Sequence, residues 1–302
     1  MKKPLMLDNL LGEVGAIETL KQALVLYETV GMRAASLSLR TRKEYVNDLT
    51  DLVAYLGKGG ITRPEQVTLA HLRVYLADLE RRGYKASTRN RKVHTVKGFF
   101  HFLHDYAVIR DDVARQLIPP PVARGEPRFL TETEYARLLE VARANVRDAA
   151  IIELFLQTGI TLSELVNLSV HDVSLSSGAG SIRIQRGGGH ALIPLNDKAQ
   201  NALRKWLQVR EPMSNTGLFL TALNKGISKR AVQVMLAKYL DAAGIQGASV
   251  QSLRHTMAVH HIAKGTPLKT LAAILGDQVE SLQVYLSAAR KLQQRALQEH
   301  ML

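Results

Sequence analysis

The segment Ile118-Pro-Pro-Pro-Val-Ala-Arg-Gly-Glu-Pro127 determines how this chain is organised. No α-helix runs through three consecutive prolines, because proline lacks a backbone N–H group and its ring clashes with the preceding turn. The chain has 302 residues, which is long enough for two domains that each bury a core. The sequence therefore predicts a first domain at residues 1–117, a proline-rich linker at 118–128 and a second domain at 129–302.

The first domain is helical by pattern. Apolar residues recur at i, i+3 and i+4 spacing, which places them on one face of a helix. Gly57 and the pair Gly59-Gly60 end one of these patterns, as glycines often do at the ends of helices. Helices are expected at about residues 15–31, 40–57, 68–83 and 86–106.

The second domain combines helices with a short β region. Thr131 and Glu134 have the spacing of a capping box and predict a helix to about residue 144. Ser181-Ile-Arg-Ile184 and His190-Ala-Leu-Ile193 predict two strands, joined by the turn Arg186-Gly-Gly-Gly189. Further helices are expected at about residues 147–157, 196–210, 228–243, 250–264, 266–275 and 279–300. The predicted class is mostly α with a small antiparallel β-sheet.

Composition and charge narrow the class of partner. Apolar residues make up 46% of the chain and the net charge is +13, with a pI near 10.0. A polyanionic partner suits this charge, although a ribosome-associated or membrane-surface protein could share it. The absence of cysteine excludes disulfides, thiolate zinc sites and cysteine nucleophiles. Asp8 and Glu13 interrupt the apolar run after Met1, and no apolar stretch approaches ~20 residues, so we expect a soluble cytoplasmic protein without membrane contact.

Basic residues gather near the end of the first domain. A solvated helix face usually mixes charges of both signs, whereas residues 81–97 contain no acid. Ser87 and Thr88 at the expected helix start add groups that contact phosphate. Aromatic residues and charges do not alternate in the pattern of a stacking platform for single strands, so duplex DNA is the expected ligand. A merely soluble basic face is the alternative. The candidate DNA-binding residues are Arg40, Arg42, Lys43, Arg81, Arg82, Lys85, Thr88, Arg89, Arg91, Lys92 and Lys97.

Several motifs, in the same order along the chain, resemble those of the tyrosine site-specific recombinases of the phage-integrase type. Residues 90–103 and the prolines are similar to the end of their helical core-binding domain. Residues 157–165 resemble the first catalytic block, and Leu253-Arg-His255 resembles the second. Leu275-Gly-Asp277, followed by Tyr285, resembles the last. The resemblance implies an N-terminal core-binding domain and a catalytic-type domain.

This resemblance, which covers about residues 35–295, implies a defined chemistry. In the family a tyrosine attacks the scissile phosphate and forms a 3′-phosphotyrosyl link. Two arginines hold the non-bridging oxygens, because negative charge concentrates there in the transition state. A lysine on the β-turn protonates the departing oxygen, and two histidines, or a histidine and a tryptophan, assist. No metal or other cofactor is required. The implied activity is DNA recombination or integration, typical of a mobile element, in a nucleoid-associated protein.

Three of the implied catalytic positions are retained or partly retained. Tyr285 corresponds to the nucleophile and Arg254 to the second arginine. Arg186 stands at the β-turn lysine position, where arginine keeps the charge but is a poor proton donor. Tyr285 follows Asp277 by eight residues, one fewer than is usual in the family. On a helix this difference rotates the tyrosine by roughly 100°.

Three other positions are substituted. Thr161 stands where the first arginine is expected, Gln251 where the first histidine is expected and Asp277 where the later histidine is expected. Asp277 also brings negative charge toward a phosphate. Losing one preorganised charge-stabilising donor costs about 10²–10³ in rate, although such losses are not additive. The sequence therefore predicts a pseudoenzyme, a duplex DNA-binding protein with impaired or absent cleavage.

Two other functions stay open at this point. An atypical active recombinase would use Tyr285, Arg254 and Arg186 with other groups in the substituted roles. A transcriptional regulator would reuse the fold to bind DNA without paired inverted sites. His255 and the pair His260-His261 have no matched carboxylates, so no metal site is expected.

The C-terminal segment, residues 287–302, has an amphipathic pattern through Ala289, Leu292, Ala296 and Leu297. In the family such a tail packs against a neighbouring protomer. The resemblance thus implies a homo-oligomer, or a hetero-oligomer with another recombinase, on DNA. A helix that packs within its own chain is the alternative.

Overall fold

The computed structural model forms two compact units, Met1–Arg124 and Gly125–Leu302. The division falls inside the proline-rich segment 118–128. Several sequence-based expectations lie outside the described residues: the apolar run after Met1, the start of the first expected helix, Gly187, the end of the tail, and the side chains of Arg40, Ala296 and Leu297. The structure describes residues 17–35, 37, 39–122, 125–176, 179–186, 188–211 and 214–300.

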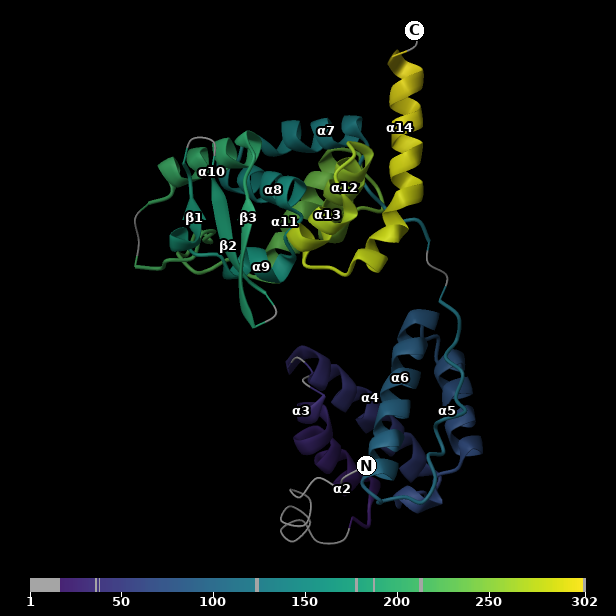
Figure 1. Ribbon diagram of the computed structural model, residues 1–302. Coiled ribbons are helices and arrows are strands. Elements are labelled where there is room, and N and C mark those ends of the chain that lie inside the picture. Colours follow the sequence, from purple (N-terminus) through teal and green to yellow (C-terminus); the bar gives the residue numbers. More distant parts are fainter. Residues whose placement is uncertain are drawn as a thin grey trace. The chain divides into compact units, whose positions relative to one another are not determined.

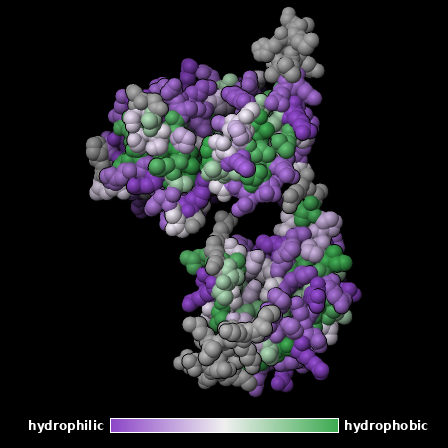
Figure 2. All heavy atoms as spheres, in the orientation of Figure 1, coloured by the Kyte–Doolittle hydropathy of each residue, from purple (hydrophilic) through white to green (hydrophobic). Residues whose placement is uncertain are grey.

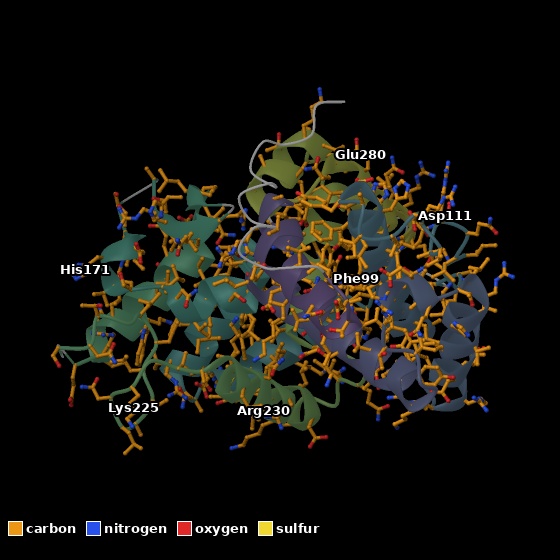
Figure 3. All side chains as sticks on the ribbon, turned by 90° about the horizontal axis from the view of Figure 1, so that it is seen from below. Phe99, Asp111, His171, Lys225, Arg230 and Glu280 are labelled. Carbon is orange, nitrogen blue, oxygen red and sulfur yellow. The ribbon has the colours of Figure 1, made fainter. Side chains whose placement is uncertain are left out.

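Unit 1 is a bundle of helices (Figure 1). Its elements are α2 (Leu20–Leu26), the π turn η1 (Tyr27–Gly31), α3 (Met32–Ala34), α4 (Leu39–Lys58), the 3-10 turn η2 (Pro64–Gln66), α5 (Leu69–Arg81) and α6 (Ala86–Asp105). Helix α6 is the centre of the apolar core, because Val93, Val96, Phe99 and Leu103 are all buried along its length. Figure 3 labels Phe99 among them. Hydrophilic residues cover much of the visible face of each unit (Figure 2). No helix among the described residues is long and apolar enough to span a membrane.

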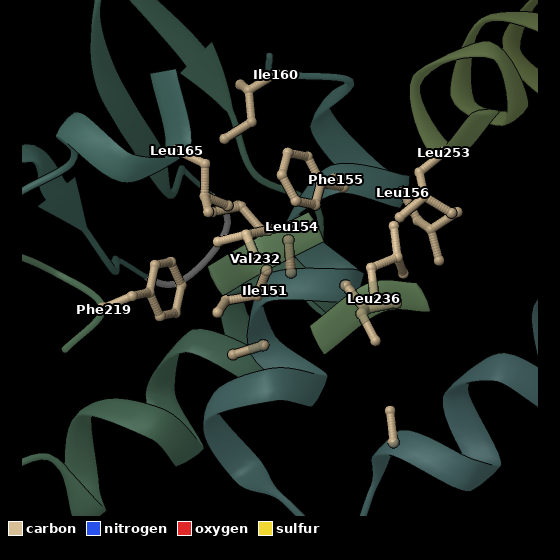
Figure 4. Packing of buried hydrophobic residues seen from close by; sticks show 14 of the residues in the cluster. Ile151, Leu154, Phe155, Leu156, Ile160, Leu165, Phe219, Val232, Leu236 and Leu253 are labelled. Carbon is tan, nitrogen blue, oxygen red and sulfur yellow. The ribbon is translucent and has the colours of Figure 1, made fainter. Parts of the chain in front are cut away.

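Unit 2 is built around α8 (Val146–Thr158), which packs against α10 (Asp197–Val209) and α12 (Val250–Ala263). Ile151, Leu154 and Phe155 of α8 form the centre of its core, together with Val232 of α11 and Leu253 of α12 (Figure 4). The burial of α8 follows from its nearly continuous apolar sequence. The helices are α7 (Glu132–Ala142), α8 (Val146–Thr158), α9 (Leu162–Asn167), η3 (Val170–Asp172), α10 (Asp197–Val209), α11 (Lys229–Ala242), α12 (Val250–Ala263), α13 (Leu268–Leu275), η4 (Val279–Tyr285) and α14 (Leu286–His300).

A small antiparallel sheet completes unit 2. Strands β1 (Val173–Ser174), β2 (Ser181–Arg186) and β3 (Gly189–Pro194) lie in the order β1-β2-β3. Ile182 pairs with Ile193, which places both in the core, and Arg186 pairs with Gly189 at the turn. The predicted class, mostly α with a small antiparallel sheet, is confirmed. Strand β1 was not predicted, because two residues are too few to show alternation.

The single helix expected at 279–300 is wrong in its first part. Residues 279–285 form the 3-10 turn η4, and α14 begins only after Tyr285. Over seven residues, apolar spacing does not separate a period of 3.0 from one of 3.6. Tyr285 therefore lies at the end of a 3-10 turn, where the rotation expected for an α-helix does not apply.

Candidate functional site

Arg254 lies on α12 and is the most buried of the six candidate catalytic positions, with 5% of its surface exposed. Its Nη1 donates to the carbonyl oxygen of Gly159, and its Nη2 donates to that of Leu275 at 2.8 Å. The same Nη2 donates to Asp277 Oδ2 at 2.7 Å. The two carbonyls end α8 and α13, where a positive charge is favourable. Arg254 thus joins two helix ends and a carboxylate.

Arg186, at the end of β2, is held by a second carboxylate. Its Nε donates to Glu164 Oε1 at 2.7 Å, and its Nη1 donates to the carbonyl oxygen of Ile274 at 2.8 Å. The side chain crosses Gly276, where a Cβ would lie 2.4 Å from Arg186 Cδ. Gly276 also has a φ of +69°, which favours glycine. Burial raises the pKa of Glu164, but the hydrogen bond from Arg186 and those from Thr161 outweigh it and leave that pKa below its ordinary value.

Thr161 is the N-cap of α9. Its Oγ1 accepts a hydrogen bond from the backbone N–H of Glu164 at 3.2 Å, and the Glu164 carboxylate accepts one from the Thr161 N–H at 2.6 Å. This reciprocal pair is a capping box, which satisfies two N–H groups that a helix start leaves unpaired. The position expected to hold the first arginine therefore carries a residue that starts a helix. The spacing of Thr161 and Glu164 is visible in the sequence, but its meaning was missed.

Tyr285 belongs to the apolar cluster formed by α12, α13 and α14, with 6% of its surface exposed. Its ring lies 5.5 Å from the ring of His255, measured between centroids. Burial raises the pKa of the Tyr285 hydroxyl, the charge of Arg254 opposes this, and the charge of Asp277 adds to it. The net effect of these surroundings is a pKa of Tyr285 above its ordinary value.

His255 connects Tyr285 to Gln251. His255 Nδ1 lies 3.1 Å from the carbonyl oxygen of Arg128, which can only accept, so Nδ1 carries the proton. His255 Nε2 then accepts from the amide of Gln251 at 3.2 Å. Burial lowers the pKa of His255, which fits this neutral form. Within the described residues, no group of three or more His, Asp or Glu side chains is placed to hold a metal ion.

A cavity of about 440 Å³ brings three of the six candidate positions together: Thr161, Gln251 and Arg254. Arg230, on the first turn of α11, lines the same cavity. Arg230 is not among the residues predicted from the sequence. Its only local signal is a basic pair with Lys229, and nothing in the sequence joins that pair to α9 or α12.

The basic run in unit 1 is less open than its sequence implied. Lys92 is 4% exposed, and its Nζ lies 3.2 Å from Asp48 Oδ1 and 2.9 Å from Asp51 Oδ2. Arg91 pairs with Asp48, and Arg82 pairs with Asp51 at 3.1 Å. The acids come from α4, so a search of residues 81–97 alone could not find them.

Other cations of this group also have partners. Lys97 Nζ donates to the carbonyl oxygens of Arg115 and Leu117 at 3.0 and 3.1 Å. Arg89 lies 2.7 Å from Glu80, and Arg42 Nε donates to the carbonyl oxygen of Leu37. Arg81 pairs with Asp78, yet 73% of its side chain is exposed. Exposed or half-buried side chains also occur at Lys43, Lys85 and Thr88.

Comparisons with known proteins give a consistent result. Residues 128–291 match the phage integrase family, and residues 27–105 match the phage integrase N-terminal SAM-like domain. Tyrosine recombinase XerC of Roseiflexus castenholzii is 30% identical over 264 residues, which cover 83% of this chain and 83% of that protein. Tyrosine recombinase XerC of Vibrio cholerae is 30% identical over 257 residues, 82% of each chain. The XerH site-specific recombinase, solved with its palindromic difH substrate, has a similar fold, with a TM-score of 0.72, 18% identity and coverage of 90% of this chain and 84% of that one.

Proposed function

Since this chain belongs to the phage integrase family of tyrosine recombinases, which acts in DNA recombination, we propose that it binds duplex DNA with impaired or absent strand cleavage. The SAM-like domain lies in unit 1 and the catalytic-type integrase domain in unit 2. In this role the protein marks or occludes a recombination site, or acts as a non-catalytic partner subunit of an active recombinase.

The observation that carries this proposal is the ion pair between Arg254 and Asp277. A recombinase needs an uncompensated guanidinium at the phosphate, because charge stabilisation at the non-bridging oxygens is the largest single contribution to such a reaction. Here the guanidinium already holds a carboxylate and two carbonyl oxygens. A phosphate would have to compete with Asp277 for Arg254.

The other positions support the same conclusion. Thr161 caps α9 and brings no charge, and the Gln251 amide is neutral. Arg186 is neutralised by Glu164. Tyr285 is buried in the apolar cluster, where its hydroxyl stays protonated. Each missing charge-stabilising group costs about 10²–10³ in rate when removed alone, so little cleavage is expected.

DNA affinity is proposed to rest on exposed cations of both units. In unit 1 these are Arg81, Lys43 and Lys85, whereas Lys92 and Lys97 stabilise the helical bundle. Oligomers would form through α14, which extends away from the rest of unit 2 (Figure 1). Its first turns are tied to their own unit, because Lys291 lies 2.5 Å from Glu126.

A covalent-adduct assay tests the proposal. The full chain is incubated with duplexes from its own locus that carry a nick at each position in turn, then denatured. We expect binding that weakens steeply with salt, about −0.9 in log–log slope per neutralised phosphate, and no adduct. An adduct that disappears in Tyr285→Phe would show an active recombinase. Failure to bind any duplex at physiological salt would refute the DNA-binding role.

One observation favours the second candidate, an atypical active recombinase. The charge of Arg254 acts on the Tyr285 hydroxyl and opposes the effect of burial on its pKa. A phosphate that displaced Asp277 from Arg254 would bring the scissile bond toward this tyrosine. The same nicked duplexes separate the two candidates, because only the active enzyme leaves a phosphotyrosyl product.

A further inference from the structure

The cavity of about 440 Å³ in unit 2 is bounded by the first turns of three helices. Thr161 and Leu162 belong to the start of α9, Arg230 to that of α11, and Val250 and Gln251 to that of α12. The cavity lies within one compact unit, so its lining is fixed by the packing of that unit. The kind of ligand that it favours can therefore be inferred from the residues that line it.

The charge in this cavity comes from Arg230. Arg254 also lines it, but Asp277 neutralises that guanidinium from a position outside the lining. No acid is among the residues that line the cavity. Arg230 is exposed on α11 (Figure 3), and it forms no ion pair with any described residue. A positively charged wall without a counter-ion favours an anion.

Neutral donors also line the cavity. Gln251 uses one side of its amide toward His255, and an amide nitrogen has two hydrogens. The N–H groups of Ser252 and Leu253 donate to the carbonyl oxygen of Ser249. Those of Val250 and Gln251 remain among the groups that a helix cannot satisfy internally, and such groups bind phosphate.

Apart from Gln233 and Ser249, the rest of the lining is apolar, with Leu162, Leu236, Leu240 and Val250 among its members. A free phosphate ion needs no such surface, whereas a deoxyribose ring packs well against aliphatic side chains. The volume is also larger than one phosphate requires. The walls thus suit a phosphodiester together with part of its neighbouring sugar.

We propose that this cavity holds one backbone phosphate of duplex DNA and that Arg230 is the residue that anchors it. This inference rests on the proposed DNA-binding function and names the contact that supplies part of it. The anchor takes over the electrostatic role that Thr161 cannot fill and that Arg254, paired with Asp277, cannot fill alone. It positions the DNA, and it implies no cleavage.

A methylphosphonate scan tests this contact. A duplex bound by the full chain is prepared with a single neutral methylphosphonate at successive backbone positions. Affinity is then measured for the unchanged protein, Arg230→Gln, Arg230→Lys and the control Lys238→Gln. Lys238 is exposed on the same helix but does not line the cavity.

For the unchanged protein we expect one position where the methylphosphonate weakens binding about tenfold, the effect of one hydrogen-bonded charge. Arg230→Gln should weaken binding to the unmodified duplex by a similar factor and lower the salt slope by about 0.9. A methylphosphonate at that one position should not weaken the binding of Arg230→Gln any further. Arg230→Lys should recover part of the affinity, and Lys238→Gln should keep the full methylphosphonate effect.

The outcomes separate this inference from the function on which it rests. If the unchanged protein binds no duplex, both fail. If it binds duplex but Arg230→Gln and the methylphosphonates act independently at every position, the DNA-binding function stands and the anchor at Arg230 is refuted.

Discussion

Replacing Asp277 by asparagine removes one negative charge and keeps the size of the side chain. Breaking a fully buried ion pair costs about 3–5 kcal/mol. Asp277 is 35% exposed, and Arg254 keeps two carbonyl acceptors, so the loss should be smaller. The asparagine oxygen can also still accept a hydrogen bond. We expect a decrease of about 1–2 kcal/mol in the free energy of unfolding, toward the lower end of the range of about 1.5–3 kcal/mol for a hydrogen bond to a charged group.

Urea unfolding measures this change, because the chain's one tryptophan lies in unit 2, the unit that contains Asp277 and Arg254. Trp206 lies on α10 of unit 2, and its Nε1 donates to the carbonyl oxygen of Leu218. The midpoint of its fluorescence transition should fall while the slope with urea concentration stays constant. Asp241→Asn is the matched control, since Asp241 is exposed and its replacement changes the net charge equally.

The same substitution should strengthen DNA binding. Without Asp277 the charge of Arg254 is uncompensated, so Asp277→Asn should raise duplex affinity severalfold, more at low salt than at high salt. Asp241→Asn should raise it less. Lower stability combined with higher affinity is the signature of a carboxylate that competes with phosphate. If Asp277→Asn left both quantities at the values of the control, or lowered affinity, the competition between Asp277 and phosphate would be refuted.

Three further substitutions have definite expected outcomes. Burial raises the pKa of Glu153, so the native state binds more protons than the unfolded state between pH 4.5 and the raised native pKa, and over that window it loses stability as pH rises. Glu153→Gln should therefore stabilise at pH 7 and have little effect at pH 4, measured by urea unfolding. Lys92→Met removes the ammonium group that pairs with the buried carboxylate of Asp48, so the free energy of unfolding should fall by about 3 kcal/mol. Faster hydrogen exchange in α4 and α6 would measure this loss. Gly276→Ala forces a positive φ on alanine and displaces Arg186. The free energy of unfolding, measured by Trp206 fluorescence, should fall by about 1–2 kcal/mol.

The longer elements of the fold could be predicted because each carries a local signal. Periodic apolar residues and a capping box located α7 and α8 within a few residues of their observed bounds. A glycine-rich turn located the β2–β3 hairpin. The short elements β1 and α9 lack enough residues for a period, and η4 was taken for part of a longer α-helix.

The site was harder to predict, because its chemistry depends on contacts between distant segments. The pairing of Lys92 with Asp48 joins residues on α6 and α4, and that of Arg254 with Asp277 joins α12 to the loop after α13. A local search for acids finds neither partner. Arg230 could not be recognised for the same reason, since it gains its neighbours Thr161 and Gln251 only when three helices pack.

Arg254 illustrates why a retained side chain is a poor guide to retained catalysis. Its guanidinium satisfies carbonyl groups at the ends of α8 and α13, and this bonding would stabilise unit 2 whether or not a phosphate ever arrived. Arg254→Ala would leave those carbonyls and Asp277 without a partner, so its loss of DNA binding would be confounded with loss of folding. Arg230 makes no such contacts with the residues that the structure describes. For this reason substitutions at Arg230, and not at Arg254, distinguish a protein that holds phosphate from one that only keeps the fold.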